Sequence, residues 1–242
     1  MPKALRENSF SITNKKFEAS LAVSKDALDD DQYGQIVIRV RQMAEAARNY
    51  YAERAFTILA AGNASTYGTC YDGQNFYSDT HSEGDSGTQD NLGSSALTSA
   101  SLSAARTAMM RMKDDRGKPM GIIGDTIVVP PELEATALEI VGADRIERYT
   151  ASGTDKVPDM NVHKGQYKVI VTPFITDTDS WHLLATKRVT RPLIYQNRMP
   201  TDFVALEGNS EAGFMRDEYL YGVKNRFEIG YGDWRLAYAN VP

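Results

Sequence analysis

The feature that most constrains this 242-residue chain is a long helical pattern between Asp31 and Ala61. Apolar residues recur there at spacings of three and four, while Arg39, Glu45 and Arg48 occupy the opposite face. Because 3.6 residues complete one turn of an α-helix, this pattern predicts an amphipathic helix. The predicted helix is much longer than the roughly 11-residue average, so we interpret it as a structural spine.

Both ends of this pattern carry helix-terminating signals. Asp29-Asp30-Asp31 lie at its start, and Gly62-Asn63 follow it. Carboxylates at a helix start complement the helix dipole, and glycine lets the chain leave the helix. We interpret the acidic triplet as a cap rather than a metal site, because consecutive side chains diverge and cannot chelate one ion together.

The segment before the helix, Phe10 to Val23, alternates loosely between apolar and polar residues. A polar break at Thr13 to Lys16 divides it, and the pattern predicts a β-hairpin. A two-stranded hairpin cannot bury its apolar face on its own. We therefore expect its apolar side chains to contact another surface, in this subunit or the next. The residues concerned are Phe10, Ile12, Phe17 and Leu21.

Residues 62–95 are rich in Gly, Ser, Thr, Asn and Asp, which predicts a long, irregular, exposed stretch. Its aromatic residues Tyr71, Phe76 and Tyr77 are further candidates for contacts between subunits. A second helix is expected next, with Thr98 as its N-cap and Lys113 near its end.

The rest of the chain mixes one short helix with several strands. A buried strand at 122–129 stops at Pro130-Pro131, and the prolines start a third helix that Gly142 closes. Without a repeated strand–helix–strand unit, the element order predicts an α+β fold and excludes a Rossmann fold or an α/β barrel. The further strands are expected at residues 167–171, 181–185, 193–196 and 219–238.

Composition narrows the class of protein. Hydrophobic residues make up 42% of the chain and charged residues 24%, as in a folded soluble protein. A net charge of −5 argues against a chain that wraps nucleic acid with its whole surface. The single cysteine, Cys70, excludes an intrachain disulfide, and no apolar run is long enough for a membrane span. We expect a soluble protein made in a reducing cytoplasm.

Residues that carry chemistry are few, and we predict no catalytic, cofactor-binding or metal site. His81, His163 and His182 do not lie at metal-ligand spacing from one another. Ser78-Asp79-Thr80-His81 combines a hydroxyl, a carboxylate and an imidazole, but adjacent residues rarely aim at one reacting atom. We interpret this segment as a hydrogen-bonded loop anchor. A hydrolase that uses His81 or His182 is the alternative of another class.

Several segments, in their order and separation, resemble the major head subunit family of Mu-like phages and prophages. The resemblance covers most of the chain. The segments that carry it are 76–81 (FYSDTH), 127–137 (IVVPPELEATA), 167–173 with Trp181, 191–196 (RPLIYQ) and the tail 217–238.

The resemblance implies a Hong Kong 97 type capsid fold with a long spine helix, peripheral and axial subdomains and an N-terminal extended hairpin loop. It implies that residues 1–30 form part of the extended loop and that 31–120 form the peripheral subdomain with the spine. Residues 121–188 would form the axial subdomain, and 189–242 the return strands of the peripheral subdomain. Family members carry an N-terminal arm and the outgoing half of the loop, whereas this chain starts almost directly at Ala4-Leu5.

The same resemblance implies a major capsid protein of the virion, assembled in the bacterial cytoplasm into an icosahedral shell around DNA. Its implied partners are further copies of itself in hexamers and pentamers, with scaffold, portal or decoration proteins as other candidates. Packaged DNA would be contacted only non-specifically, and no membrane is implied. A cargo-holding nanocompartment shell on the same fold is the alternative.

Overall fold

The computed structural model of the chain describes residues 11–31, 34–149, 156–206 and 215–242. These residues divide into two compact units. In the described part of the chain, unit 1 comprises residues 56–194 and 230–242, and unit 2 comprises residues 11–55 and 195–229. Both helices and sheets are present, so the α+β class predicted from the element order is confirmed.

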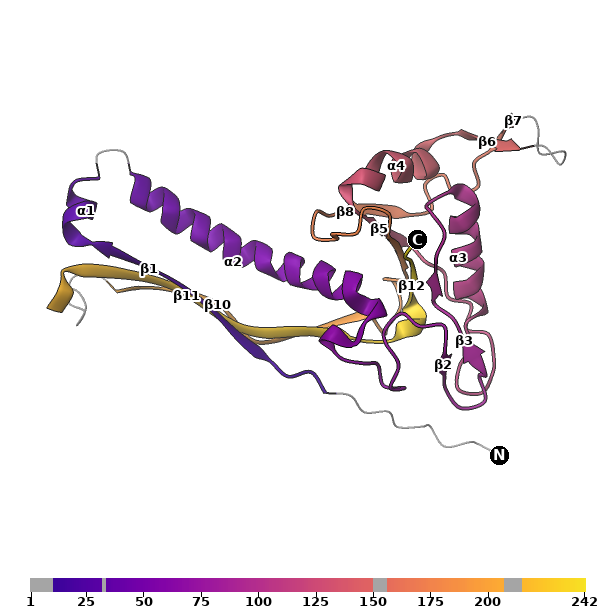
Figure 1. Cartoon of the computed structure of the whole chain (residues 1–242), viewed down its shortest axis with the longest axis horizontal. Helices are drawn as coiled ribbons and strands as arrows, with labels where there is room; N and C mark the ends of the chain where they lie inside the picture. Colours follow the sequence, from indigo (N-terminus) through magenta and orange to yellow (C-terminus); the bar gives the residue numbers. More distant parts are fainter. Residues whose placement is uncertain (1–10, 32–33, 150–155, 207–214) are drawn as a thin grey trace. The chain divides into compact units, whose positions relative to one another are not determined.

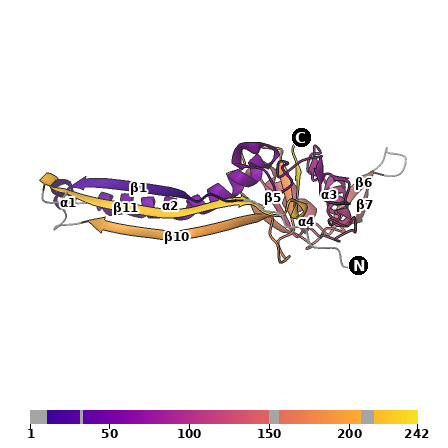
Figure 2. The same cartoon turned by 90° about the horizontal axis from the view of Figure 1, so that it is seen from below.

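Unit 2 consists of a three-stranded sheet with a long helix along it (Figure 1). The strand order is β1-β11-β10, and Figure 2 shows the three strands side by side. Three of its elements, α2, β10 and β11, continue into unit 1. The elements are β1 (Lys15–Ser24), α1 (Lys25–Asp29), α2 (Gln35–Ala60), β10 (Leu193–Leu206) and β11 (Glu218–Tyr231).

Helix α2 is the spine that the sequence predicts, and Asp31 caps it. The two carboxylate oxygens of Asp31 accept hydrogen bonds from the backbone N–H groups of Gln35 (3.0 Å) and Ile36 (2.9 Å). These donors have no partner within the helix, so the cap satisfies them. The helix passes into a 3₁₀ turn, η1 (Ala61–Asn63), at the predicted end.

The predicted N-terminal hairpin is wrong. Strand β1 is one continuous strand that pairs antiparallel with β11, with Lys15 opposite Phe227 and Ser24 opposite Glu218. The pairing partner comes from the far end of the sequence, which local patterning cannot reveal. The supposed turn overlaps the first residues of β1, and Phe10 lies outside the described residues.

Unit 1 is built on a five-stranded sheet of order β4-β12-β9-β5-β8. β5 runs parallel to β8 and antiparallel to β9, and β12 runs antiparallel to β9 and parallel to β4. All residues of β5 and β9 are buried, as their apolar sequences predict. The strands are β4 (Leu92–Gly93), β5 (Thr126–Val129), β8 (Lys168–Val171), β9 (Trp181–Leu184) and β12 (Ala237–Asn240).

Two helices of unit 1 begin where the sequence signals predict. Helix α3 (Ser99–Arg111) starts at a capping box, in which Ser101 N–H donates to the Thr98 hydroxyl (3.1 Å) and Thr98 N–H donates to Ser101 Oγ (2.9 Å). Helix α4 (Glu134–Gly142) follows a proline-led 3₁₀ turn, η3 (Pro131–Leu133).

Short elements complete unit 1. β2 pairs with β3, and β6 pairs with β7, both antiparallel. The sequence predicts neither pair, because their residues are mostly polar and the segments are short. They are η2 (Ser65–Tyr67), β2 (His81–Ser82), β3 (Thr88–Gln89), β6 (Arg145–Tyr149), β7 (Lys156–Met160) and η4 (Trp234–Leu236).

The observed units do not follow the expected subdomain boundaries. Residues 61–120, expected with the spine helix, lie in unit 1 together with residues 121–188. The assignment of peripheral and axial subdomains stays a prediction. Among the helices of the described residues, none has the length and apolar character needed to cross a membrane.

Candidate assembly surface

The spine helix buries little of itself within the chain. Its two buried residues, Ile58 and Leu59, lie in unit 1, so no residue from Gln35 to Ala55 is buried. Val37 and Ile38 are 49% and 45% exposed. Burying apolar surface stabilises a complex by roughly 25 cal/mol per Å². Binding of another protein over this helix would therefore be favourable.

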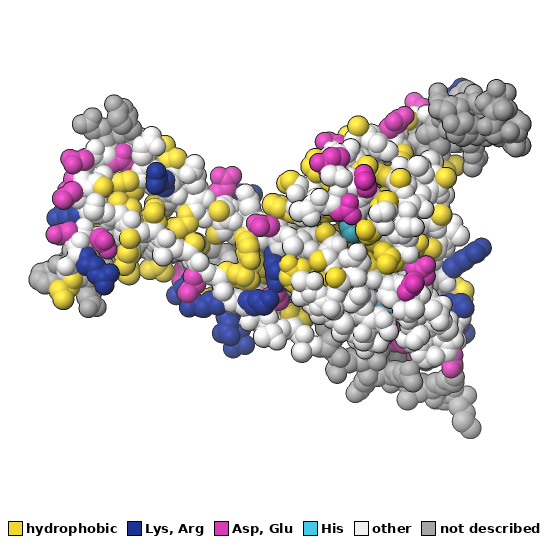
Figure 3. Space-filling view, in the orientation of Figure 1, with side chains coloured by type: hydrophobic (Ala, Val, Ile, Leu, Met, Phe, Trp, Pro, Cys, Tyr) yellow, Lys and Arg dark blue, Asp and Glu magenta, His cyan; other side chains and the backbone are white. Residues whose placement is uncertain are grey.

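Strand β10 carries a second exposed apolar set. Every residue from Ile194 to Leu206 is exposed. Tyr195, Met199 and Phe203 lie on one face of the strand because their spacing is even, and Val204 lies on the other. Figure 3 shows hydrophobic side chains gathered on the visible face of unit 2.

A single aromatic cluster joins α2 to the sheet inside unit 2. Phe227 is fully buried at its centre. The ring centroids of Tyr51, Phe17, Tyr195 and Tyr50 lie 4.4, 5.0, 5.7 and 6.0 Å from that of Phe227. Phe17, expected at a subunit interface, therefore packs against its own chain and remains half-buried.

One buried carboxylate reinforces this cluster. Glu228 accepts hydrogen bonds from Arg54 Nε (3.0 Å) and Nη2 (3.3 Å), and Lys15 Nζ lies 3.4 Å from its second oxygen. Burial alone would raise the pKa of Glu228, but the Arg54 hydrogen bonds, the Ile229 N–H and both positive charges outweigh it. The pKa is lowered, so the carboxylate stays charged at neutral pH.

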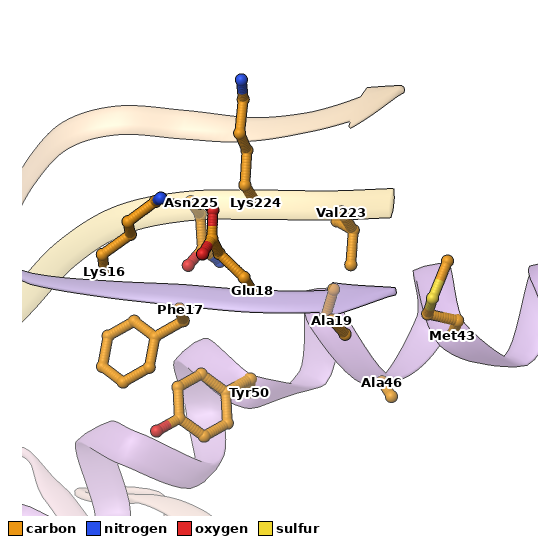
Figure 4. Close-up of a pocket in the computed structure, with 11 residues that line it drawn as sticks. Lys16, Phe17, Glu18, Ala19, Met43, Ala46, Tyr50, Val223, Lys224 and Asn225 are labelled. Carbon is orange, nitrogen blue, oxygen red and sulfur yellow. Dashed lines mark ion pairs between the residues drawn. The ribbon is translucent and has the colours of Figure 1, made fainter. Parts of the chain in front are cut away.

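A groove of about 480 Å³ runs between β1 and α2. Its apolar lining includes Phe17, Met43 and Tyr50. In Figure 4 the rings of Phe17 and Tyr50 lie on the helix side of β1, whereas Lys16 and Glu18 point to the other side. The groove exists because small side chains, Ala19, Ala46 and Ala47, line the rest of the contact.

The other predicted hairpin residues have different positions. Leu21 is half-buried and lines a second groove of about 490 Å³ with Val23 and Ile36. Ile12 is half-buried in the segment that precedes β1. Phe10 lies outside the described residues. Their role in contacts between subunits stays a prediction.

Phe76 and Tyr77 do not form part of any surface, which corrects the prediction for these two residues. Their side chains are 0% and 1% exposed. Phe76 stacks on Tyr231 (4.7 Å between centroids), and Tyr77 stacks on His182 (5.4 Å). Gly62 makes this packing possible, because a Cβ there would lie 2.6 Å from Tyr77 Cδ2. The flanking polar residues suggest an exposed loop, but the loop folds its aromatic rings inward.

Tyr71 is half-buried and belongs to a polar network inside unit 1. Its hydroxyl donates to Glu83 (3.1 Å), which also accepts from Arg235 (3.1 Å). Arg235 in turn donates to both carboxylate oxygens of Asp233 (2.8 and 3.1 Å). Burial raises the pKa of Tyr71, so the phenol stays neutral. This network ties the long loop to η4.

His81 anchors the same loop, as the sequence analysis favours. Its Nδ1 lies 2.6 Å from Asp72 Oδ2 and its Nε2 lies 3.3 Å from the Phe76 carbonyl oxygen. The imidazole stacks on Trp234 at 4.0 Å with an interplanar angle of 1°. Because the side chain is fully buried and both nitrogens are engaged, it has no free nitrogen to act as a base on a substrate.

The remaining chemical candidates are also buried. Burial lowers the pKa of His182 to about 4 and raises the pKa of the Cys70 thiol to about 12. His163 Nε2 lies 2.9 Å from the Ser103 hydroxyl. Within the described residues, no group of three or more His, Cys, Asp or Glu side chains could hold a metal ion.

Two exposed apolar sets could not be predicted from the sequence. On α2, Val37 and Ile38 belong to the apolar pattern, which does not distinguish a face packed inside the chain from one left open. On β10, the strand was expected to end near Gln196 because polar residues and Pro200 follow. The even spacing of Met199 and Phe203 with Tyr195 is the signal that could have extended it.

Comparisons with known proteins decide the family. The model of the phage capsid protein family matches residues 7–240. The chain belongs to this family. The fold is of the Hong Kong 97 type, as the resemblance implies, and the mature capsid of bacteriophage PhiM1 supports it. That structure aligns with a TM-score of 0.55 at 11% identity, over 99% of this chain and 76% of the other.

Two curated relatives of this capsid protein are head proteins. The major head subunit of the Mu-like prophage FluMu of Haemophilus influenzae is 24% identical over 237 residues, which is 98% of this chain and 53% of the relative. The major capsid protein of Escherichia phage Mu is 23% identical over 236 residues, 97% of this chain and 53% of the relative. The chain therefore spans about half the length of the curated relatives it matches.

Proposed function

We propose that this capsid protein is the major head subunit of a tailed phage or prophage and assembles with copies of itself into an icosahedral shell that encloses DNA. The family match and the names of both curated relatives support this proposal. They favour a phage head over a cargo-holding nanocompartment. The buried positions of His81 and His182 count against the hydrolase alternative.

The observation that carries the proposal is that unit 2 leaves apolar side chains of α2 and β10 exposed. A helix segment of 21 residues with none buried, from Gln35 to Ala55, gains little from its own chain. The exposed apolar residues of α2 and β10 lie on the same unit. Extended apolar surface of this kind marks a protein interface, and further copies of the chain would cover it.

In this mechanism the protein acts by binding copies of itself through many separate contacts. Hexamers and pentamers would share similar contacts, and each weak contact would gain strength because many close the same shell. Ile12, Phe17 and Leu21 are proposed to contribute beside α2 and β10. Scaffold, portal or decoration proteins are further proposed partners, and packaged DNA would be touched only non-specifically.

Electron microscopy of the purified chain in negative stain tests the proposal. We expect shells, tubes or capsomers from the wild-type protein and none from Ile38→Asp, because a carboxylate would have to be buried in the interface. Ile38 lies in the first turn of α2, where a carboxylate suits the helix dipole, so the fold should persist. Val189→Asp is the matched control, since Val189 is fully exposed in unit 1.

The two outcomes against the proposal differ. A wild-type chain that remains monomeric at high concentration would contradict self-assembly. Normal particles from Ile38→Asp would instead exclude α2 from the interface and leave self-assembly standing.

A further inference from the structure

The face of the unit 2 sheet that points away from α2 carries a concentration of charge. Lys16, Glu18 and Lys224 all point to this side (Figure 4). In the antiparallel register Lys16 lies opposite Arg226, and Glu18 lies opposite Lys224. Residues on one face of a strand alternate, so these four side chains share the outer face of the sheet.

Strand β10 extends the same face. Asp202 lies 3.7 Å from Lys224 and therefore shares its side, and Arg198 shares it by even spacing. Lys16 pairs with Glu18 at 2.5 Å. Glu218 shares this side by the same even spacing on β11, so the outer face holds four cations and three anions, on a chain whose net charge is −5. Among the described residues, Arg226 is exposed and forms no ion pair.

The direct opposition of Lys16 and Arg226 has a cost. Like charges that face each other across a ladder destabilise a sheet. Glu18 compensates Lys16, but among the described residues Arg226 has no ion-pair partner. An external anion would remove this repulsion.

The end of unit 2 around α1 has the opposite charge. Backbone N–H of Lys25 donates to the Asp217 carbonyl oxygen (2.7 Å), which brings the start of β11 to α1. Figure 3 shows acidic side chains at this end with some basic ones among them, and further basic side chains along the sheet. Lys25, Arg39 and Arg216 are the cations there. The carboxylates other than the Asp31 cap are Asp26, Asp29, Asp30, Asp217 and Glu218.

We propose that the outer face of the sheet in one copy binds the acidic α1 end of unit 2 in a second copy. The inference rests on the proposed self-assembly and names a contact within it. The two surfaces differ and each occurs once per chain, so their pairing is head-to-tail, the geometry that closes rings. Val204 and Leu206, exposed on the outer face, add apolar area to the contact.

A second copy fits this face better than a nucleic acid does. Two of the four cations already have a carboxylate partner on the same face, Lys16 with Glu18 and Lys224 with Asp202. Phosphate backbones are bound by a clear excess of Lys and Arg, and this face has only a small one. The acidic end supplies several carboxylates in one place, which matches a face of mixed charge.

A charge swap between the two surfaces tests the contact. Arg226→Glu reverses the outer face, and Asp29→Lys with Asp30→Lys reverses the acidic end. Light scattering would give the protein concentration at which assembly begins, at low and high salt. We expect each reversal to raise that concentration by about tenfold, the combination to restore it, and salt to weaken wild-type assembly. Arg116→Glu makes the same charge change at an exposed loop of unit 1 and should have no effect.

The same set of variants includes a control for folding. A glutamate at position 226 faces Lys16, so the thermal midpoint of Arg226→Glu should hold or rise while its assembly is lost. If the combined variant failed to assemble, the contact would be excluded, and the same holds if Arg226→Glu assembled normally. Loss of DNA binding in Arg226→Glu with unchanged assembly would reassign the face to a polyanion. A monomeric wild-type chain would overturn this inference together with the proposed function.

Discussion

Unit 1 and unit 2 bury their apolar residues to different extents. Among the largest fully buried side chains of the described residues, only Phe227 belongs to unit 2, while Trp181, Trp234, Tyr77 and Phe76 all belong to unit 1. Both units expose large apolar residues; those of unit 2 lie along α2 and β10, whereas Ile123, Leu138 and Val189 of unit 1 lie on separate segments. Unit 1 therefore differs from unit 2 in its large buried core rather than in having no exposed apolar residues.

A buried amide also helps to hold the core of unit 1 together. In unit 1 the side-chain amide of Asn91 donates to the carbonyl oxygens of Phe76 (2.8 Å) and Trp234 (3.1 Å), and its oxygen accepts from Ser78 N–H (2.9 Å). Satisfied groups of this kind fix one arrangement of the core. We therefore expect unit 1 to depend mainly on its own core, and unit 2 to gain stability in the proposed assembly.

The largest expected effect comes from the core of unit 1. Trp234→Ala should lower the free energy of unfolding by about 4 kcal/mol, because it leaves a cavity beside His81. Phe203→Ala, an aromatic truncation at an exposed site of unit 2, should change it by less than about 1 kcal/mol. Urea unfolding of dilute, dissociated protein measures both. Equal losses from the two variants would remove the distinction between the units.

Acid should also weaken unit 1 through His182. Its pKa in the folded chain is about 4, below the ordinary 6.5, because burial disfavours the charged imidazole. Below about pH 6.5 the unfolded chain binds this proton and the folded chain does not, so stability falls as pH falls. We expect a loss of about 2 kcal/mol between about pH 7.5 and pH 5, measured by urea unfolding.

His182→Phe isolates this contribution. The phenyl ring keeps the stacking on Tyr77 and cannot titrate. The loss of stability between the two pH values should therefore be about 2 kcal/mol smaller in the variant than in the wild type. The same pH dependence in both proteins would show that folding does not lower the pKa of His182.

The sequence was sufficient for features encoded by neighbouring residues. The spine helix with its Asp31 cap, the Thr98 capping box and the buried strand before Pro130 all depend on local patterns, and the structure has each of them. The resemblance supplied the fold type, which periodicity alone could not.

The features that could not be predicted depend on residues far apart in the sequence. β1 resembles half of a hairpin until β11, some 200 residues away, is seen to pair with it. Phe76 and Tyr77 look like loop residues because their stacking partners, Tyr231 and His182, are also distant in sequence. For the same reason the exposure of Val37 and Ile38 could not be read from a helical period, which is the same for covered and open faces.

The last of these effects concerns how unit 2 stabilises its small core. Glu228→Gln should cost about 2 kcal/mol, because Arg54 would keep a largely buried charge without its carboxylate. Glu18→Gln is the matched control: its ion pair with Lys16 is exposed, and its loss should cost less than about 0.5 kcal/mol. Thermal unfolding of the two variants measures the difference.

The pH dependence of Glu228→Gln makes this comparison sharper. The pKa of Glu228 is lowered in the fold, so its stabilisation is present above its ordinary value of 4.5 and is lost as pH falls below it. The gap between wild type and Glu228→Gln should therefore shrink in acid. A constant gap would mean that Glu228 stabilises unit 2 by packing rather than by charge.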